Sequence, residues 1–313
     1  MKRIVSVILC MTAILCLFCS CGNEDNKKDD GKLNIVTTIF PPYDFAKNVG
    51  GEYVNVSMLL KPGMESHSYD PTPQDIIKIQ ECDLFIYTGG ESDEWIKDIL
   101  ESSDRKPKKT LAMMDVCETV REETVDGMEK DEDDGDEIEY DEHVWTSPKN
   151  AVHIADAIDS VLKELDKDHT DEFEKNTSEY KNKLSQLDGD FREITDNAKR
   201  KTLVFGDRFP FRYFADEYGL KYYAAFPGCS SETEPSPSTI SFLINKVKAE
   251  KIPVVFSIEF SNGKVADTIC ESTGAKKLTF HSCHNVTQEQ FNNGVSYLSL
   301  MYDNVKALKE ALS

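Results

Sequence analysis

The chain has 313 residues, which is long enough for two domains of ordinary size, each with its own core. Its 57 acidic residues outnumber its 36 basic residues and give a formal net charge of −21 at pH 7. We therefore expect no nucleic-acid partner, because binding to a phosphate backbone requires a basic surface. An acidic surface suits a cation as ligand, although acidity also serves solubility in general.

The first residues predict an export signal. A basic start is followed by an apolar run over residues 4–18, which is too short for a stable membrane span and is typical of a signal peptide. The run ends in the segment LFCSCG at residues 17–22, which resembles a bacterial lipoprotein signal. We expect residues 1–20 to be removed and Cys21 to carry the lipid, with Cys19 as the alternative. An uncleaved anchor helix is the other interpretation.

Residues 21–32 are expected to form a flexible tether. From residue 23 on they are polar and charged and show no apolar periodicity. Loss of residues 1–20 would remove Lys2 and Arg3 and no acidic residue, which changes the net charge from −21 to −23. The protein is then extracytoplasmic, anchored to the outer face of the cell membrane by its N-terminal lipid.

Residues 33–165 predict an N-terminal lobe in which strands and helices alternate. We expect strands over residues 34–38, 54–59 and 83–88, and helices over residues 43–48, from residue 73, and around residues 95–100. Alternation at this spacing favours a parallel sheet with covering helices. The helix that begins at Pro73 has the clearest start, because Thr72 is a good N-cap and Asp75 completes a capping box.

Two histidines precede helix starts of this kind. His67 lies in the proline-bracketed segment PGMESHSYDPTP at residues 62–73, just before the helix described above. His143 lies in DEHVWTSP at residues 141–148, where a serine and a proline begin the next helix. Two imidazoles held at loop-to-helix junctions predict half of a metal site.

The segment between these histidines is strongly acidic. Residues 122–142 contain thirteen acidic residues and one lysine, with few aliphatic side chains. Such a composition cannot bury a core, so we interpret the segment as a mobile, solvated loop. Weak attraction of hard cations to its carboxylates is the functional alternative.

The second half of the chain repeats the plan of the first. A helical pattern from residue 171 to about 200 would be ~45 Å long, enough to run along both lobes. After it we expect strands over residues 202–205, 222–226, 254–258 and 278–280, and helices over residues 213–219, 236–247, 264–272 and 294–312. We therefore divide the chain into an N-terminal lobe, a connecting helix over residues 166–200, and a C-terminal lobe over residues 201–313.

Five segments together resemble the zinc/manganese ABC-transporter solute-binding proteins of the high-affinity zinc uptake type. They are TIFPPY at residues 38–43, PGMESHSYDPTP, DEHVWTSPKNA at 141–151, SETEPSPSTI at 231–240 and ADTICESTGAKKL at 266–278. The resemblance runs in order from about residue 34 to the end. It implies an α/β fold of two Rossmann-like parallel-sheet lobes joined by a long rigid helix, with the metal site in the cleft between them.

The resemblance also implies a ligand set. His67 and His143 match two of the family's histidine ligands. A third ligand, His or Glu in the family, is expected at the end of the strand over residues 202–205. Alignment along that strand selects Asp207, whereas counting back from a later tyrosine selects Arg208, whose guanidinium cannot be a ligand. We favour Asp207, with a structural or salt-bridged role as the alternative.

The last expected ligand lies in the loop after residue 280. The family carries an acidic residue there, and His281 falls next to its position, so we favour His281, with His284 and Cys283 as alternatives. The five cysteines beyond Cys21 are an odd number for an oxidising compartment. A disulfide between Cys229 and Cys283, both in the resembled cleft region, is our guess, and it would remove Cys283 as a ligand.

The resulting hypothesis is a monomeric, lipid-anchored receptor that captures a divalent transition metal and passes it to an ABC permease, without catalysis. Nitrogen and sulfur donors favour Zn²⁺, while an aspartate ligand favours a harder ion such as Mn²⁺. The rivals are a metallohydrolase, a cysteine-histidine enzyme built on Cys283 and a surface adhesin. The sequence has no HExxH helix and no evident general base beside the candidate ligands.

Overall fold

The computed structural model describes residues 31–64, 69–102, 105–129, 139–230 and 234–313. The chain divides into two units, Met1–Lys32 and Leu33–Ser313, and the elements below all belong to the second. The predicted signal peptide, Cys21 and almost all of the tether lie outside the described residues, and so does His67. Within the described ranges, no helix is both long enough and apolar enough to cross a membrane.

The first sheet has four parallel strands in the order β2-β1-β3-β4. They are β1 (Leu33–Thr37), β2 (Val54–Met58), β3 (Leu84–Tyr87) and β4 (Lys109–Ala112). Helices α2 (Phe40–Gly50), α3 (Pro73–Glu81) and α4 (Glu94–Ser102) follow the first three strands. The predicted strands and helices of this lobe are confirmed, including the capping box of Thr72 and Asp75 at the start of α3. The edge strand β4 was not predicted.

The second sheet repeats this arrangement, with four parallel strands in the order β6-β5-β7-β8. They are β5 (Thr202–Arg208), β6 (Lys221–Phe226), β7 (Val254–Ser257) and β8 (Lys276–Thr279). Its helices are α7 (Arg212–Tyr218), α8 (Pro237–Glu250), α9 (Lys264–Thr273), the short α10 (Gln288–Asn292) and α11 (Tyr297–Leu312). The predicted repetition is confirmed, and only α10 was missed.

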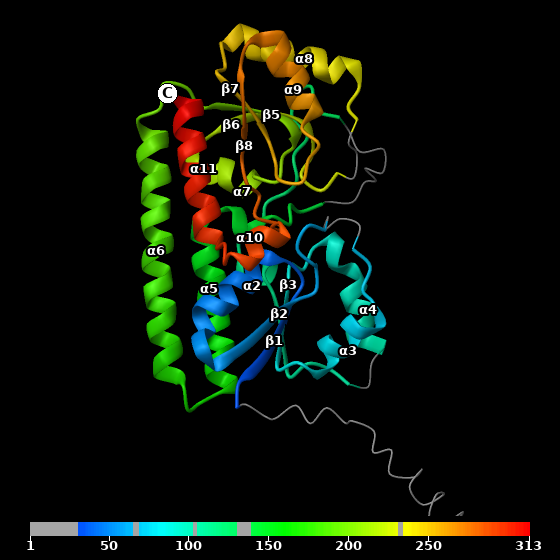
Figure 1. Ribbon diagram of the computed structural model, residues 1–313, viewed down its shortest axis with the longest axis vertical. Helices are drawn as coiled ribbons and strands as arrows, with labels where there is room; N and C mark the ends of the chain where they lie inside the picture. The colour runs from blue at the N-terminus through cyan, green and yellow to red at the C-terminus, as the bar shows by residue number, and fades with distance from the viewer. Residues whose placement is uncertain (1–30, 65–68, 103–104, 130–138, 231–233) are drawn as a thin grey trace, which may run out of the picture. The chain divides into compact units, whose positions relative to one another are not determined.

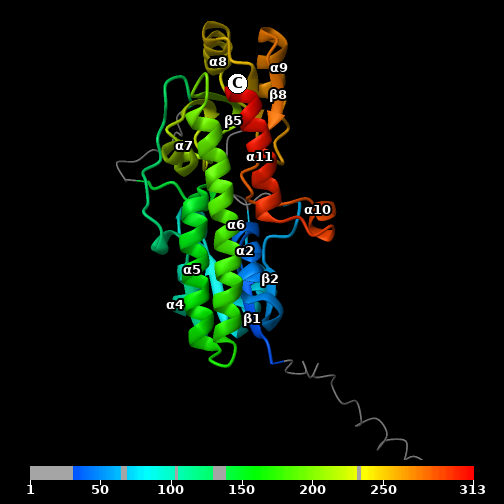
Figure 2. The same cartoon turned by 90° about the vertical axis from the view of Figure 1, so that its left-hand side faces the viewer.

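Two long helices pack side by side, and the longer one contacts helices of both halves. Helix α5 (Pro148–Leu165) packs against α6 (Thr170–Asp196), and α6 also packs against α2, α7 and α11 (Figures 1 and 2). The predicted long helix is therefore confirmed, with 27 residues. One continuous hydrophobic core joins α2, α5, α6, α7 and α11 to one face of each sheet, while α3 with α4, and α8 with α9, cover the opposite faces. The two lobes thus share a core instead of having one each.

The strand order places a topological switch point in each sheet, between β1 and β3 and between β5 and β7. Ligand sites in open α/β sheets form at the carboxyl ends of strands near such points. The loops after the strands of one sheet contact those of the other: the Phe40 N–H donates to the His284 carbonyl (3.2 Å), and the Gly63 N–H donates to the Val286 carbonyl (2.8 Å). The fold therefore brings loops at the carboxyl ends of the two sheets together.

Candidate metal centre

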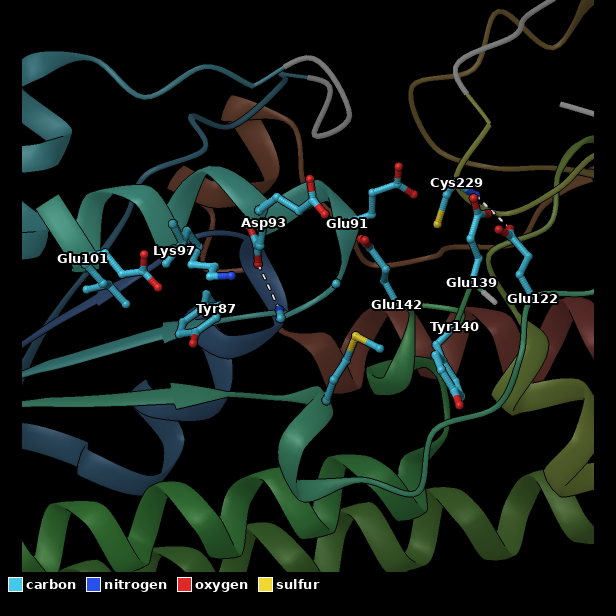
Figure 3. Close-up of a pocket in the computed structure, with 16 residues that line it drawn as sticks. Tyr87, Glu91, Asp93, Lys97, Glu101, Glu122, Glu139, Tyr140, Glu142 and Cys229 are labelled. Atoms are coloured by element: carbon cyan, nitrogen blue, oxygen red, sulfur yellow. Dashed lines mark hydrogen bonds between the residues drawn. The ribbon is translucent and has the colours of Figure 1, made fainter. Parts of the chain in front are cut away.

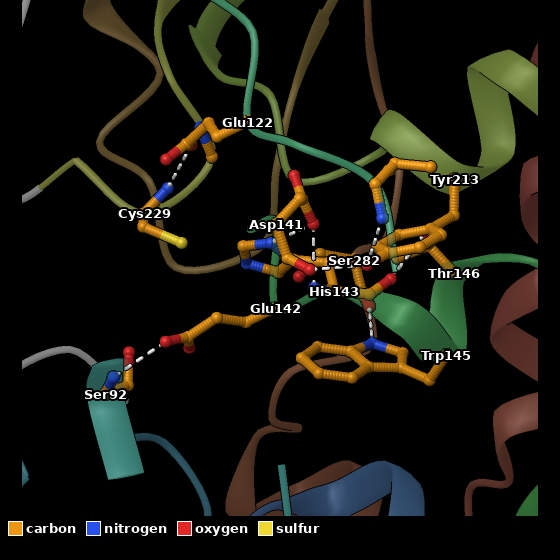
Figure 4. A network of polar contacts seen from close by, with 12 residues as sticks. Ser92, Glu122, Asp141, Glu142, His143, Trp145, Thr146, Tyr213, Cys229 and Ser282 are labelled. Carbon is orange, nitrogen blue, oxygen red and sulfur yellow. Dashed lines mark hydrogen bonds and ion pairs between the residues drawn. The ribbon is translucent and has the colours of Figure 1, made fainter. Parts of the chain in front are cut away.

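His143 lies fully buried where the chain passes from the acidic segment into α5. The segment Val144–Thr146 forms a single 3₁₀ turn after it, and the Ser147 side chain caps α5. One carboxylate oxygen of Asp141 accepts the His143 backbone N–H (2.8 Å) and lies 3.1 Å from ring atom Nδ1 (Figure 4). A carboxylate at Nδ1 favours the tautomer that leaves the Nε2 lone pair available, as in histidines that bind metals.

The charge around His143 favours a cation. Burial lowers the pKa of the imidazole, but the nearby carboxylates of Asp141, Glu142 and Glu122 outweigh burial and raise the pKa above its usual value. A metal ion in the same place would benefit from the same negative field, because it adds positive charge where the carboxylates already stabilise it. The surroundings of His143 are therefore electrostatically suited to a divalent cation.

His284 meets His143 from the other sheet. The two ring centroids are 4.9 Å apart and the rings are nearly perpendicular, at 84°. The indole ring of Trp145 lies against both imidazoles, with centroids 5.3 Å from His143 and 4.8 Å from His284. Its Nε1–H donates to the Ser282 carbonyl (2.8 Å), which ties the turn that carries His284 to the segment that carries His143 (Figure 4).

His281, the residue favoured from sequence, is held by its backbone. The Asn304 side chain, fully buried in α11, accepts the His281 N–H (2.7 Å) and donates to its carbonyl (2.8 Å). Among the described residues, His284 and not His281 makes ring contact with His143. The role of His281 as a ligand stays a prediction.

Asp207 is buried at the end of β5. One of its carboxylate oxygens accepts the Arg208 N–H (3.0 Å) and the other accepts the Ile258 N–H (3.2 Å), which links the ends of β5 and β7. Burial raises its pKa. Its neighbour Arg208 lines a cavity of about 20 Å³ together with His284 and donates from Nη1 to the Ser230 carbonyl (3.3 Å). The ligand role of Asp207 also stays a prediction.

The segment that contains His67 is flanked by residues that adjoin His284. Met64 lines the cavity of about 20 Å³ with His284, and Tyr69 lines a second cavity, of about 30 Å³, that also includes His284. The Asn285 side chain donates to the Met64 carbonyl (2.9 Å). Both ends of this segment are thus fixed beside His284, although His67 itself lies outside the described residues.

A larger acidic cavity of about 680 Å³ adjoins the site (Figure 3). Seven carboxylates line it: Glu91, Asp93, Glu94, Glu101, Glu122, Glu139 and Glu142. Burial raises the pKa of Asp93 to about 6 and that of Glu122 to about 7. Glu142 lines both this cavity and the one of about 30 Å³ beside His284, and it accepts the Ser92 N–H (2.7 Å). Its negative field therefore extends to the histidine pair.

The acidic segment is partly packed, so the expectation of a solvated loop is wrong for the buried Met128, Asp141 and Glu142, while Glu123 and Glu139 are exposed as expected. Met128 is buried in the shared core. The Glu122 carboxylate accepts the Gly228 N–H (2.8 Å), and the Glu129 carboxylate accepts the Ser236 N–H (2.7 Å). Acidic side chains in a loop are usually hydrated. Here two of them instead accept hydrogen bonds from backbone N–H groups, one at the start of α8 and one in the loop after β6. Residues 130–138 lie outside the described residues.

The guessed disulfide is not present. Cys229 and Cys283 are both free thiols, as are Cys82, Cys117 and Cys270. Burial raises the pKa of the Cys229 and Cys283 thiols well above the usual value, so both are protonated at neutral pH. The sequence places both cysteines near the cleft, but proximity of segments does not determine the Cα separation that a disulfide needs.

The sequence analysis did not single out several residues that surround His143. Asp141, Glu142 and Trp145 touch it or its partner, and His284 was only an alternative. Their signal was the run Asp-Glu-His-Val-Trp itself, since metal-bound imidazoles usually have a carboxylate on the other ring nitrogen. In the part of the chain that the structure describes, no three His, Cys, Asp or Glu side chains are arranged to hold a metal ion. The histidine pair therefore needs a further donor from elsewhere.

Comparison with solved structures defines the class of the protein. The crystal structure of the Zn(II)-bound ZnuA-like domain of Streptococcus pneumoniae AdcA superposes with a TM-score of 0.74 and 32% identity, covering 90% of this chain and 99% of that domain. Two parallel sheets of the same topology, with buried His143 in contact with half-buried His284 at their junction, make this chain a two-lobe α/β protein of the ZnuA-like metal-binding type.

Comparison of sequences defines the family. The sequence model of the family "Zinc-uptake complex component A periplasmic" matches residues 35–311. The zinc-binding lipoprotein AdcA of Streptococcus pneumoniae is 34% identical over 99% of this chain, which spans 61% of the length of AdcA. The high-affinity zinc uptake system protein ZnuA of Bacillus subtilis is 30% identical over 98% of this chain and 97% of its own length. The chain belongs to this zinc-uptake family.

Proposed function

We propose that the protein captures a divalent transition metal outside the cytoplasm and delivers it to an ABC permease, with Zn²⁺ as the expected ion and Mn²⁺ as the alternative. The observation that carries the proposal is the contact between His143, which is fully buried, and His284, which is half-buried and comes from the other sheet. Imidazole nitrogens suit Zn²⁺ better than a hard ion such as Mn²⁺. The names of the zinc-binding relatives support the same ion.

The ligand set that we propose is His143, His284 and His67. His143 binds through Nε2, because Asp141 faces Nδ1. His67 is the third ligand, since Met64 and Tyr69, on either side of its segment, both lie at cavities that include His284. Asp207 and His281 remain candidates from sequence, but their hydrogen bonds favour roles in fixing the ends of β5 and the loop after β8.

We propose binding without catalysis. The thiols of Cys229 and Cys283 are protonated by burial and are poor nucleophiles. A metal enclosed by protein donors has no open position for an activated water, which is the physical difference between carrying a metal and using it. The membership of a zinc-uptake family supports this reading.

The proposal includes a lipid anchor at Cys21, a position outside the cytoplasm and a monomeric state. The lipoprotein signal at residues 17–22 and the description of the AdcA relative as a lipoprotein support the anchor. The family description, a zinc-uptake complex component, supports delivery to a permease. Mass spectrometry of the chain from membranes would test the anchor, with a diacylated N-terminal Cys21 as the expected product.

Equilibrium dialysis of the purified full-length chain, followed by metal analysis, tests the function. We expect about one Zn²⁺ per chain, displacement of Mn²⁺ by Zn²⁺ in direct competition, and no hydrolysis of esters or peptides by the loaded protein. A chain that retains no metal after dialysis would overturn the proposal. Turnover of a hydrolase substrate would favour the metallohydrolase.

A further inference from the structure

We propose that Glu259 is a positioning residue for His284; this inference rests on the proposed function. Glu259 follows β7, and its carboxylate accepts three hydrogen bonds from one turn. Oε2 accepts the Ser282 N–H (2.7 Å), while Oε1 accepts the Ser282 Oγ–H (2.6 Å) and the His284 N–H (3.2 Å). Hydrogen bonds to a carboxylate are stronger than those between neutral groups. The turn is therefore fixed by a residue from a different loop.

The turn needs such a restraint because its backbone is strained. Cys283 has φ of 62°, in the left-handed region that residues other than glycine avoid. Backbone of this kind persists only where its surroundings determine it, and it clusters at functional sites. The carboxylate of Glu259 accepts the backbone N–H groups of Ser282 and His284, the residues before and after Cys283. It thereby stabilises the conformation that turns the His284 ring toward His143.

His284 is also held at its other peptide group. Its carbonyl accepts the Phe40 N–H (3.2 Å) at the start of α2, so one sheet fixes the carbonyl and the other, through Glu259, fixes the N–H. The ring then contacts both Trp145 and His143. With both peptide groups and the ring restrained, the carboxylate of Glu259 determines where the ring nitrogens point, and metal affinity depends on that direction.

The geometry favours positioning over ligation. Glu259 lines the same cavity of about 20 Å³ as His284, but both of its oxygens already accept donors of the turn. A glutamine in its place keeps the shape but has one acceptor oxygen and one donor NH₂, so an NH₂ group would face an N–H or O–H of the turn. Glu259→Gln therefore removes the clamp with little change in packing.

The test compares the full-length wild type with Glu259→Gln, Ser282→Ala and the double variant. Ser282→Ala removes the hydroxyl, which donates to Glu259 and also accepts the His284 N–H (3.3 Å), and is the milder change because the carboxylate keeps both backbone donors. Glu271→Gln, an exposed acid on α9, is the matched control. Zn²⁺ affinity is measured by competition with a chelator, and the visible spectrum of the Co²⁺-loaded protein at full occupancy reports the coordination geometry. Circular dichroism confirms that each variant is folded.

We expect Glu259→Gln to weaken Zn²⁺ binding about 10- to 100-fold and to change the Co²⁺ spectrum, because the misplaced ring alters the coordination. Ser282→Ala should weaken binding less, and its effect should disappear in the Glu259→Gln background, because both act through one contact. Glu271→Gln should match the wild type.

Wild-type affinity and an unchanged Co²⁺ spectrum in Glu259→Gln would overturn the positioning role while leaving the proposed function intact. Additive effects of the two substitutions would also overturn it, since Glu259 would then act on the metal without the turn, as a ligand does. A wild type that binds neither metal would instead overturn the proposed function, and this inference with it.

Discussion

His143 and His284 meet edge to face with ring centroids 4.9 Å apart, one from the segment before α5 and the other from the loop after β8. Neither position is close to the other in sequence, so the contact exists only in the folded chain. In the proposed function the two imidazoles bind one metal ion, so each ring should be needed for binding.

Replacement of either ring by alanine should therefore remove metal binding without unfolding the chain. We expect His143→Ala and His284→Ala each to weaken Zn²⁺ binding by at least about 100-fold, because loss of a ligand exceeds the 10- to 100-fold effect of its hydrogen-bonding partners. Isothermal titration would measure this loss. His153→Ala, an exposed histidine on α5, is the matched control and should bind as the wild type does. Retained affinity in His284→Ala would exclude that residue as a ligand.

Metal binding should depend on pH through His143. Only the neutral imidazole binds a metal, and nearby carboxylates raise the pKa of His143, so affinity should begin to fall at a higher pH than for an ordinary histidine. Asp141→Asn removes the carboxylate at Nδ1 and should lower this pKa, moving the fall in affinity to lower pH. At pH 8 the same variant should bind about 10- to 100-fold more weakly. Identical pH profiles for the two proteins would contradict the role of Asp141.

Gly228 supplies a steric test of the site. A Cβ placed on it would lie 3.2 Å from Cε1 of His143 and 3.1 Å from the Phe209 carbonyl, which is too close for both neighbours to keep their positions. Gly228→Ala should therefore displace the His143 ring and weaken Zn²⁺ binding by about tenfold. Displacing a ligand should reduce metal affinity at least as much as removing a hydrogen bond to that ligand.

Gly189 is the matched control for this substitution. It is exposed in α6, and a Cβ there would meet no atom within 4 Å. Gly189→Ala should leave metal affinity unchanged and raise the free energy of unfolding by about 0.5–1 kcal/mol, because glycine weakens a helix interior. Urea unfolding and titration of both variants would separate the two effects. Equal metal affinities would show that Gly228 does not support the ring.

Asp44 should make stability depend on pH. Burial raises its pKa to about 6, and its carboxylate accepts the Tyr180 hydroxyl (3.3 Å) within the shared core. Because the pKa of Asp44 is higher in the folded chain than in the unfolded chain, the protonated carboxyl favours folding. Its contribution to the free energy of unfolding is fully present below about pH 4 and is lost as the pH rises through about 6. Asp44→Asn, which has no charge to bury, should then be more stable than the wild type at pH 8, by at most about 3 kcal/mol.

Urea unfolding at pH 4, 6 and 8 checks this expectation. The advantage of Asp44→Asn over the wild type should shrink as the pH falls. Asp303→Asn, at an exposed position on α11, should show no such trend. A constant difference between Asp44→Asn and the wild type from pH 4 to pH 8 would show that the carboxylate is not perturbed.

Much of the fold could be predicted because its signals are local. The capping box at Thr72 and the caps before α5 and α8 are read directly from residue types, and apolar strands bounded by helices indicate parallel sheets. Strand β4 was missed because only two of its four residues are buried, so its apolar signal is weak. The shared core was missed because it depends on how helices from both halves pack together, which no local pattern records.

The site was harder to predict because two backbone irregularities decide which side chains face it. The register between β5 and β6 shifts between Phe205 and Arg208, so counting along the strand does not identify the residue that faces the cleft. Cys283 adopts a left-handed conformation, which a cysteine in the sequence does not predict. In this conformation His284, which follows Cys283, contacts His143. Residue identity alone indicates histidines near the cleft, but the backbone selects among them.

The core that lies beneath both sheets has a consequence for the release of a bound metal ion. Trp145, Tyr180 and Tyr297 are fully buried in it, and a clamshell motion that separated the two lobes would expose all three to water. The two lobes are thus joined behind the site by a single hydrophobic core. We therefore expect release of a bound ion to displace the surface turns around His143 and His284 and to leave this core intact.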